Sequence, residues 1–76
     1  MSELEWLDIF GDNLRGIIDE YGITQSELAE DIGVSEAAIS NYIHKKKMPS
    51  IKTIINMAYA LDMDIDELID FDDTID

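Results

Sequence analysis

The pattern of apolar and polar positions is clearest between residues 25 and 44, where two groups of apolar residues are separated by a glycine. Leu28 and Ile32 are four residues apart, so they fall on the same side of a helix. Ala29 lies beside them and is small enough to let a second helix cross closely over it. The pattern therefore predicts two short amphipathic helices joined by a turn. The apolar residues after the glycine are Val34, Ala38, Ile39, Tyr42 and Ile43.

The turn between these two helices is predicted from two residues. Gly33 sits where the first helix must end, and glycine adopts the positive φ that is common after a helix without steric strain. Ser35 is placed to cap the second helix. At about 100° per residue, the polar and small residues of the second helix fall within one arc of roughly 140°, opposite its apolar side. The arc that we expect to be exposed consists of Glu36, Ala37, Ser40, Asn41 and His44.

Capping patterns place further helix starts. Thr24 and Asp64 are each followed three residues later by glutamate, which predicts a capping box at both positions. Ser50 is placed to cap a helix over residues 51–61, and Pro49 fits the loop before it. The apolar residues of that helix recur at helical spacing and are Ile51, Ile54, Ile55, Ala58 and Leu61.

Apolar residues near the amino terminus predict a first helix. Gly11 and Gly16 each destabilise a helix by about 1 kcal/mol relative to alanine, so residues 1–9 are either a separate extension or the first turn of this helix. We expect Trp6 and Leu7 to be core or dimer contacts, and Phe71 and Ile75 at the other end of the chain are further candidates for a dimer surface. The chain is thus predicted to be all-α, a compact bundle of about five short helices, with a helix-turn-helix domain over residues 10–70 and an acidic tail over residues 71–76. The helical spacing is carried by Trp6, Phe10, Leu14, Ile17 and Tyr21.

Composition limits the class of protein. A chain of 76 residues forms one domain, near the small end of what folds alone. It contains no cysteine, which excludes disulfides and thiolate metal sites and favours the cytoplasm. No apolar run approaches about 18 residues, and no basic-then-apolar amino terminus directs secretion. We therefore expect a soluble cytoplasmic protein that does not enter a membrane.

Residues for catalysis or cofactor binding are not evident. The one histidine, His44, lies in the predicted exposed arc, and no Ser/His/Asp or Cys/His arrangement accompanies it. The Asp-x-Asp-x-Asp sequence that begins at Asp62 is similar to the start of a calcium loop. However, Glu67 stands where that loop needs glycine, and Asp73 stands where it needs a bidentate glutamate. We expect no catalytic residues, no metal site and no cofactor.

The sequence from about Phe10 to Ile69 resembles the λ-repressor and Cro type of helix-turn-helix regulator, also called the XRE type. The resemblance is carried by Gln-x-x-Leu-Ala-x-x-x-Gly-Val-Ser-x-x-x-Ile-Ser over residues 25–40, by LRGIIDEYGITQ before it, and by Pro49-Ser50 and NMAYALDMDIDELI after it. It implies a sequence-specific transcriptional regulator of double-stranded DNA, Cro-like or antitoxin-like, with the helix over residues 36–44 in the major groove. Such domains commonly act as two-fold homodimers with recognition helices about 34 Å apart.

The resemblance also implies which residues meet DNA. Gln25 would contact a phosphate, and Glu36 and Ala37 would read bases. Asn41, one helical turn further along, would read another base. Alternatives stay open, because Gln25 and Glu36 also suit the first turn of a helix and His44 could be an ordinary exposed imidazole. The implied DNA-binding residues are Gln25, Ser35, Glu36, Ala37, Ser40, Asn41, His44, Lys45, Lys46 and Lys47.

Three positions depart from the family pattern. Ile18 replaces a basic residue that many members use on phosphate. Lys45 stands where glycine often follows the recognition helix, which predicts that this helix ends without its usual positive-φ residue. Glu36 adds a negative charge at the centre of the expected footprint. Together these departures predict weaker or narrower DNA binding than is usual in the family.

The net charge of −13, from 18 acids against five lysines and arginines, has the wrong sign for a protein that approaches phosphates. Four of the five basic residues nevertheless follow the predicted recognition helix directly, and exposed charges farther away than about 8 Å are largely screened. The lysine run could also be a solvated loop. The charge leaves a second hypothesis open, an acidic helical adaptor or DNA mimic that binds a basic protein partner. The four basic residues are Lys45, Lys46, Lys47 and Lys52.

Overall fold

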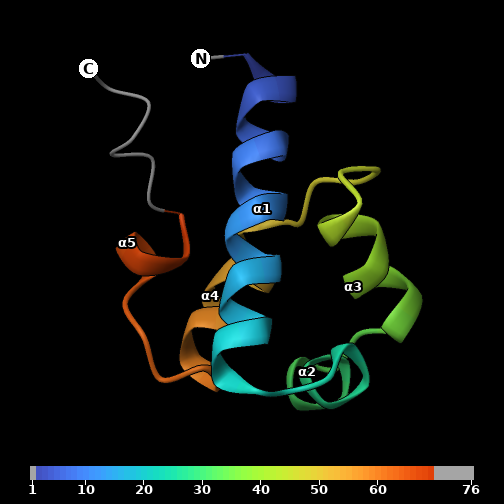
Figure 1. Cartoon of the computed structure of the whole chain (residues 1–76), viewed down its shortest axis with the longest axis vertical. Coiled ribbons are helices and arrows are strands. Elements are labelled where there is room, and N and C mark those ends of the chain that lie inside the picture. The colour runs from blue at the N-terminus through green and yellow to red at the C-terminus, as the bar shows by residue number, and fades with distance from the viewer. Residues whose placement is uncertain (1, 70–76) are drawn as a thin grey trace.

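The structure is a computed structural model that describes residues 2–69. Within that range it contains five helices and no strand, which confirms the predicted all-α bundle (Figure 1). α1 packs against α3 and α5, while α2 packs against α3 and α4. No helix in this range is both long and apolar enough to cross a membrane. The helices are α1 (Glu3–Tyr21), α2 (Gln25–Ile32), α3 (Glu36–Ile43), α4 (Ile51–Ala60) and α5 (Ile65–Leu68).

α1 is one continuous helix from Glu3, so residues 3–9 are its first turns. The hydroxyl oxygen of Ser2 caps it by accepting a hydrogen bond from the Glu5 N–H at 3.2 Å. The helix passes through Gly11 without a break because burial of its apolar side outweighs the weak helix propensity of glycine. The buried residues of α1 are Leu7, Phe10, Gly11, Leu14 and Ile18.

Trp6 and Leu7, which we expected to be core or dimer contacts, pack mainly against residues of the same chain. Leu7 is buried. Trp6 is half-buried, and its ring stacks on Phe10 with ring centroids 5.1 Å apart. The other two dimer candidates, Phe71 and Ile75, lie outside the described residues.

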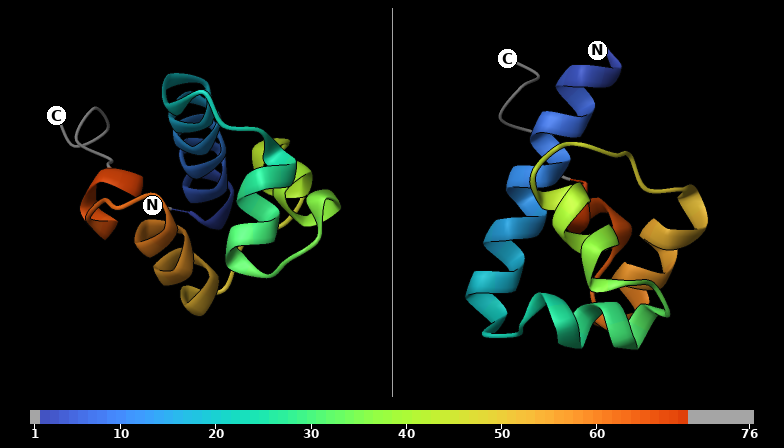
Figure 2. Two further views of the ribbon diagram at one scale, coloured as in Figure 1. Left: turned by 90° about the horizontal axis from the view of Figure 1, so that it is seen from below. Right: turned by 90° about the vertical axis from the view of Figure 1, so that its right-hand side faces the viewer.

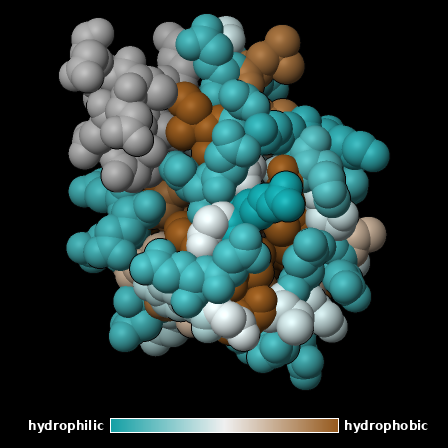
Figure 3. Space-filling view, in the orientation of Figure 1, coloured by the Kyte–Doolittle hydropathy of each residue, from teal (hydrophilic) through white to brown (hydrophobic). Residues whose placement is uncertain are grey.

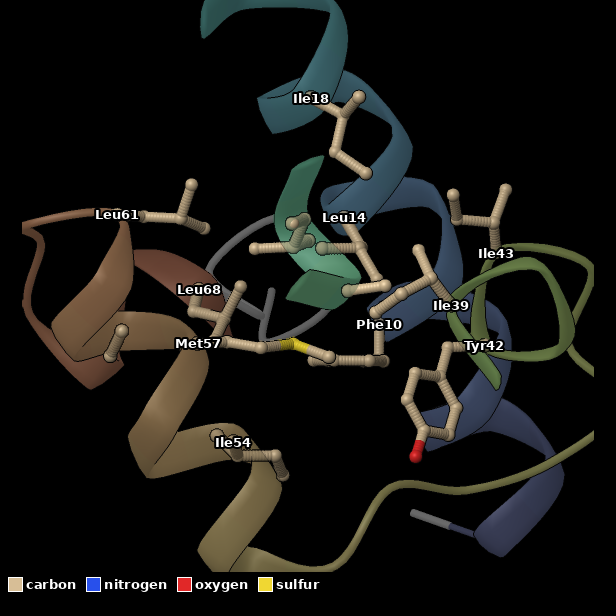
Figure 4. Close-up of a cluster of buried hydrophobic side chains, with 13 residues drawn as sticks. Phe10, Leu14, Ile18, Ile39, Tyr42, Ile43, Ile54, Met57, Leu61 and Leu68 are labelled. Carbon is tan, nitrogen blue, oxygen red and sulfur yellow. The ribbon is translucent and has the colours of Figure 1, made fainter. Parts of the chain in front are cut away.

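One hydrophobic core joins all five helices (Figure 4). Phe10 and Leu14 of α1 point toward Ile39 of α3 and Met57 of α4, while Leu68 brings α5 onto the same cluster. A helix of four residues such as α5 has little stability of its own, so this contact is what holds it in place. The largest fully buried side chains are Phe10, Leu14, Leu28, Ile39, Met57 and Leu68.

One prediction about the second half of the chain was confirmed and one was wrong. α4 begins after Ser50, as predicted, although the side chains of Ile51 and Ile55 are exposed and only Ile54, Met57 and Ala58 of this helix are buried. Asp64 precedes α5, but its side chain makes no capping hydrogen bond. The Glu67 N–H donates instead to the backbone carbonyl of Asp64 at 3.0 Å, as a short turn allows.

Candidate nucleic-acid interface

α2 and α3 form a helix-turn-helix whose turn follows the local rules of capping. The hydroxyl oxygen of Thr24 accepts from the Glu27 N–H at 3.0 Å, and the Thr24 N–H donates to the Glu27 carboxylate at 3.2 Å, which confirms the predicted capping box. Gly33 ends α2 with φ of 74°, as predicted. Ser35 then starts α3 by accepting from the Ala38 N–H at 3.1 Å. In Figure 2 the two helices cross steeply, so α3 is held away from the axis of α2.

α3 buries one side and presents the other. Ile39, Tyr42 and Ile43 are buried against the core, and Ala29 of α2 is buried where the two helices meet. On the opposite side Glu36, Ala37 and His44 are exposed, while Ser40 and Asn41 are half-buried. The predicted division of this helix into a packed side and an accessible side is confirmed.

The exposed His44 ring folds back along α3 toward Ser40. Its Nδ1 atom lies 2.9 Å from the backbone carbonyl oxygen of Ser40 and 3.1 Å from the Ser40 hydroxyl oxygen. A carbonyl oxygen can only accept, so Nδ1 carries the hydrogen of that bond. Nε2 is therefore the ring nitrogen that a further partner would meet.

The prediction that α3 ends without a positive-φ residue was wrong, because Lys45 itself adopts φ of 63°. The Lys45 N–H donates to the Tyr42 carbonyl at 3.2 Å, and the Lys46 N–H donates to the Asn41 carbonyl at 2.8 Å. These are the two bonds of a Schellman motif, the usual glycine-containing end of a helix. A lysine takes the left-handed conformation here although it is less favourable than for glycine.

Long-range contacts of its side chain explain why Lys45 is held in this conformation. The Lys45 ammonium lies 2.6 Å from an Asp8 carboxylate oxygen and 2.8 Å from an Asp12 carboxylate oxygen, both on α1. Hydrogen bonds to Asp12 and then to Asp8 raise the pKa of Lys45 above its ordinary value. The stem of the side chain passes over Gly11, where a β-carbon would lie only 2.8 Å from the Lys45 Cγ.

The three consecutive lysines therefore have different surroundings. Lys45 is paired with the acids of α1, whereas the side chains of Lys46 and Lys47 are exposed and make no ion pair in the described part of the chain. Both lie in a stretch of 25 residues, 37–61, without aspartate or glutamate, although the chain has 18 acids in total. Apart from Glu36, the accessible side of α3 and the loop after it thus lie within the longest acid-free stretch of this chain.

A shallow hollow beside α3 contains a basic residue that sequence reasoning missed. Arg15 of α1 lines it together with Gln25 at the start of α2 and His44 at the end of α3. Ile18, which replaces the basic residue of the family, lines the same hollow and is buried. Arg15 is one helical turn before it, so the positive charge is displaced along α1 and not lost. The acid Asp19 also lines this hollow.

The profile of the HTH_3 family, described as helix-turn-helix, matches residues 14–68. The chain belongs to the HTH_3 family. Membership confirms the resemblance to λ-repressor and Cro type regulators, and the match covers α2, α3, α4 and α5 completely.

Among curated proteins, the HTH_3 chain is similar to the uncharacterized HTH-type transcriptional regulator YqaE of Bacillus subtilis (strain 168). The two are 30% identical over 61 residues, which cover 80% of this chain and 53% of YqaE. The chain therefore spans about half the length of that relative.

Two solved structures have the same fold as the HTH_3 chain. The restriction-modification controller protein C.AhdI from Aeromonas hydrophila is 29% identical and has a TM-score of 0.78 over 82% of this chain and 94% of C.AhdI. An HTH_3 family transcriptional regulator from Vibrio cholerae has a TM-score of 0.83 over 88% of this chain and 38% of that one, at 18% identity. The second likeness concerns the fold alone.

Proposed function

We propose that this HTH_3 protein is a cytoplasmic transcriptional regulator that binds double-stranded DNA with the outer side of α3 in the major groove. The observation that carries the proposal is the position of the accessible side of α3 relative to the acids of the chain. Apart from Glu36 in its first turn, the accessible side of this short, capped helix lies within the longest acid-free stretch of a strongly acidic chain. The regulator role of the similar proteins supports the same conclusion.

Base reading is assigned to the outer side of α3. The amide of Asn41 can pair with N6 and N7 of adenine, and the methyl group of Ala37 can contact the methyl group of thymine. Glu36 at the start of the helix can accept a hydrogen bond from N4 of cytosine. Its charge also favours the positive end of the helix dipole, so Glu36 contributes to helix stability whether or not it reads a base.

Phosphate contacts are assigned to groups around α3. Lys46 and Lys47 supply exposed ammonium groups. On the other side, Gln25 in the first turn of α2 and Arg15 supply donors beside the hollow, where first-turn backbone N–H groups also favour an anion. The other two phosphate donors are the hydroxyl groups of Ser35 and Ser40.

Lys45 has a separate role in this proposal. Its ammonium is already bonded to Asp8 and Asp12, so contact with a phosphate would require these two ion pairs to break. We assign it to positioning the end of α3, while Lys46 and Lys47 make the ionic contacts. As a two-fold homodimer, the protein would place two α3 helices about 34 Å apart on successive turns of the groove.

The test is a selection of binding sequences from random duplexes, followed by titration of the selected duplex and a mixed-sequence duplex. Asn41→Ala should weaken binding to the selected duplex by about 1–3 kcal/mol, roughly 5- to 150-fold, with little effect on the mixed duplex. Lys46→Ala should weaken both equally and lower the salt slope by about 1 for each copy bound. The two variants serve as controls for each other.

Lys45→Ala provides the matched control within the lysine run. Because its ammonium is not counted among the phosphate contacts, this variant should leave the salt slope unchanged even if affinity falls. Equal slope losses for Lys45→Ala and Lys46→Ala would contradict the division of roles. Binding to phosphates is strongest at low salt, so the decisive titration is at about 50 mM salt. If the protein bound neither duplex there, DNA binding would be refuted. An acidic adaptor for a basic protein would then be the better explanation.

A further inference from the structure

A second surface of the molecule is apolar and exposed. On α4, Ile51, Ile55 and Tyr59 follow one another at steps of four residues and are 76%, 48% and 89% exposed. Ile65 of α5, 38% exposed, extends the same surface. We call these four residues the α4 stripe. Scattered apolar residues on a surface need no explanation, but a contiguous stripe indicates an interaction site.

The α4 stripe combines a protruding ring with a hollow. Tyr59 is the most exposed large apolar residue of the described chain. Tyr59 also lines a hollow between α4 and α5, together with Ile55, Ala58, Met63 and Ile65, and Asp64 and Asp66 line it as well. Apolar residues at steps of four along a helix can pair with a copy of themselves about a two-fold axis, because each end of the stripe then meets the opposite end of the other copy.

We propose that the α4 stripe is the homodimer interface, with two α4 helices packed antiparallel about a two-fold axis near Ile55. In that arrangement the two Ile55 side chains meet at the axis, and Tyr59 of each copy packs against Ile51 of the other. The proposal deepens the homodimer part of the proposed function by naming the surface that forms it.

Charge is the reason to prefer a second copy as the occupant. α4 has no acid, and its one charged residue is Lys52 in its first turn. Asp62, Asp64 and Asp66 follow just after its last turn. Antiparallel packing brings the first turn of one α4 to the last turn of the other, so each Lys52 meets the opposite acids. A chain of net charge −13 would repel a copy of itself at most other surfaces.

The position of the stripe leaves the DNA-binding surface open. α4 packs on α2 and α5, whereas α3 packs on α1 and α2. In the left view of Figure 2, α2 lies between α3 and α4. The face in Figure 3, which is nearest the viewer in Figure 1, is covered mainly by hydrophilic residues and does not compete as an apolar interface. A dimer through α4 therefore buries the stripe while both α3 helices stay accessible.

Interface size is consistent with a modest dimer. A standard protein interface buries about 800 Å² per partner, and a buried tyrosine contributes roughly 150–250 Å². Tyr59 and the three isoleucines form the apolar centre of such a patch, and Lys52 and the aspartates form its polar rim. Tyrosine at the centre of an interface is a common hot spot.

The experiment measures the mass of the 76-residue protein by light scattering and sedimentation without DNA, from micromolar to millimolar concentration. The wild type should have twice the mass of one chain. Tyr59→Glu should raise the dimer dissociation constant by about 30-fold or more. The matched control is Leu4→Glu on α1, which adds the same charge at a residue that is 78% exposed outside the stripe, and it should stay dimeric. Circular dichroism melting checks that both variants are folded.

Three results would overturn this interface. They are a monomeric wild type over the whole range, a dimer that persists in folded Tyr59→Glu, and a dimer that Leu4→Glu breaks instead. A conservative variant adds a second control, because Tyr59→Phe keeps the aromatic ring and should therefore stay dimeric. DNA binding is measured separately, so a dimer that binds no DNA refutes only the proposed function, and a monomer that binds DNA refutes only the interface.

Discussion

The tight contact between α1 and α3 at Gly11 gives a prediction for which a second glycine of α1 serves as the control. Gly11 and Gly16 both lie inside α1, and neither adopts a positive φ. Replacement of either by alanine should stabilise the helix by about 0.5–1 kcal/mol, because alanine loses less conformational freedom on folding. At Gly16 an added β-carbon meets nothing within 4 Å, so Gly16→Ala should show this gain in full.

At Gly11 the same β-carbon meets the end of α3. It would lie 2.8 Å from the Lys45 Cγ, 3.0 Å from the Tyr42 carbonyl oxygen and 3.1 Å from the Ile43 carbonyl oxygen. The lysine side chain can move, but the two oxygens belong to the backbone of α3. Relief therefore requires α1 and α3 to separate by a few tenths of an ångström, and overpacking of this kind destabilises a protein by about 1–3 kcal/mol.

The difference between the two variants isolates the contact, because the gain in helix propensity is common to both. We expect Gly11→Ala to be less stable than Gly16→Ala by about 1–3 kcal/mol. For a domain of this size the melting temperatures should differ by at least about 4 °C. Thermal and urea unfolding followed by circular dichroism measures both. Since α3 must shift, Gly11→Ala should also bind DNA more weakly than Gly16→Ala.

A double variant tests the source of the clash. Lys45→Ala removes the Cγ contact but leaves both carbonyl oxygens, so it should recover only part of the stability that Gly11→Ala loses. Equal stability of Gly11→Ala and Gly16→Ala would refute the close packing of α1 on α3. Full recovery in the double variant would show instead that the lysine stem alone causes the clash.

Three further predictions concern local and long-range interactions. Thr24→Ala removes the capping bond to the Glu27 N–H and should lower the free energy of unfolding by about 1 kcal/mol in urea titrations; no change would mean that the cap does not form. Leu14→Ala opens a cavity at a fully buried residue and should cost about 2–5 kcal/mol, seen as a large drop in melting temperature; a small drop would contradict its burial. Lys45→Gly relieves the left-handed strain of about 1 kcal/mol but loses the ion pairs with Asp8 and Asp12, so the two effects oppose each other and stability at neutral pH should stay close to that of wild type. Because the pKa of Lys45 is raised in the fold, its ion pairs stabilise the protein below the ordinary lysine pKa and are lost as the pH rises through the raised value. Wild type should therefore lose more stability than Lys45→Gly at alkaline pH, and parallel losses would refute this linkage.

The features predicted correctly from the sequence depend on interactions between near neighbours. Gly33 ends α2 and Ser35 starts α3 through hydrogen bonds that reach no more than five residues along the chain. The two sides of α3 follow from the rotation per residue alone. The family pattern added the order of the helices and the place of the recognition helix.

The tertiary structure decided what depends on residues far apart in the sequence. Periodicity places Ile51 and Ile55 on one side of α4, but only the packing of α2 and α5 shows that nothing within the described chain covers them. Lys45 belongs to a basic run by sequence, yet Asp8 and Asp12, more than 30 residues earlier, hold its ammonium. The sequence by itself determined the helices and their caps, because those are short-range interactions. Only the folded chain determined which lysines and which isoleucines remain available to a partner, because that depends on how α1, α3 and α4 meet in space.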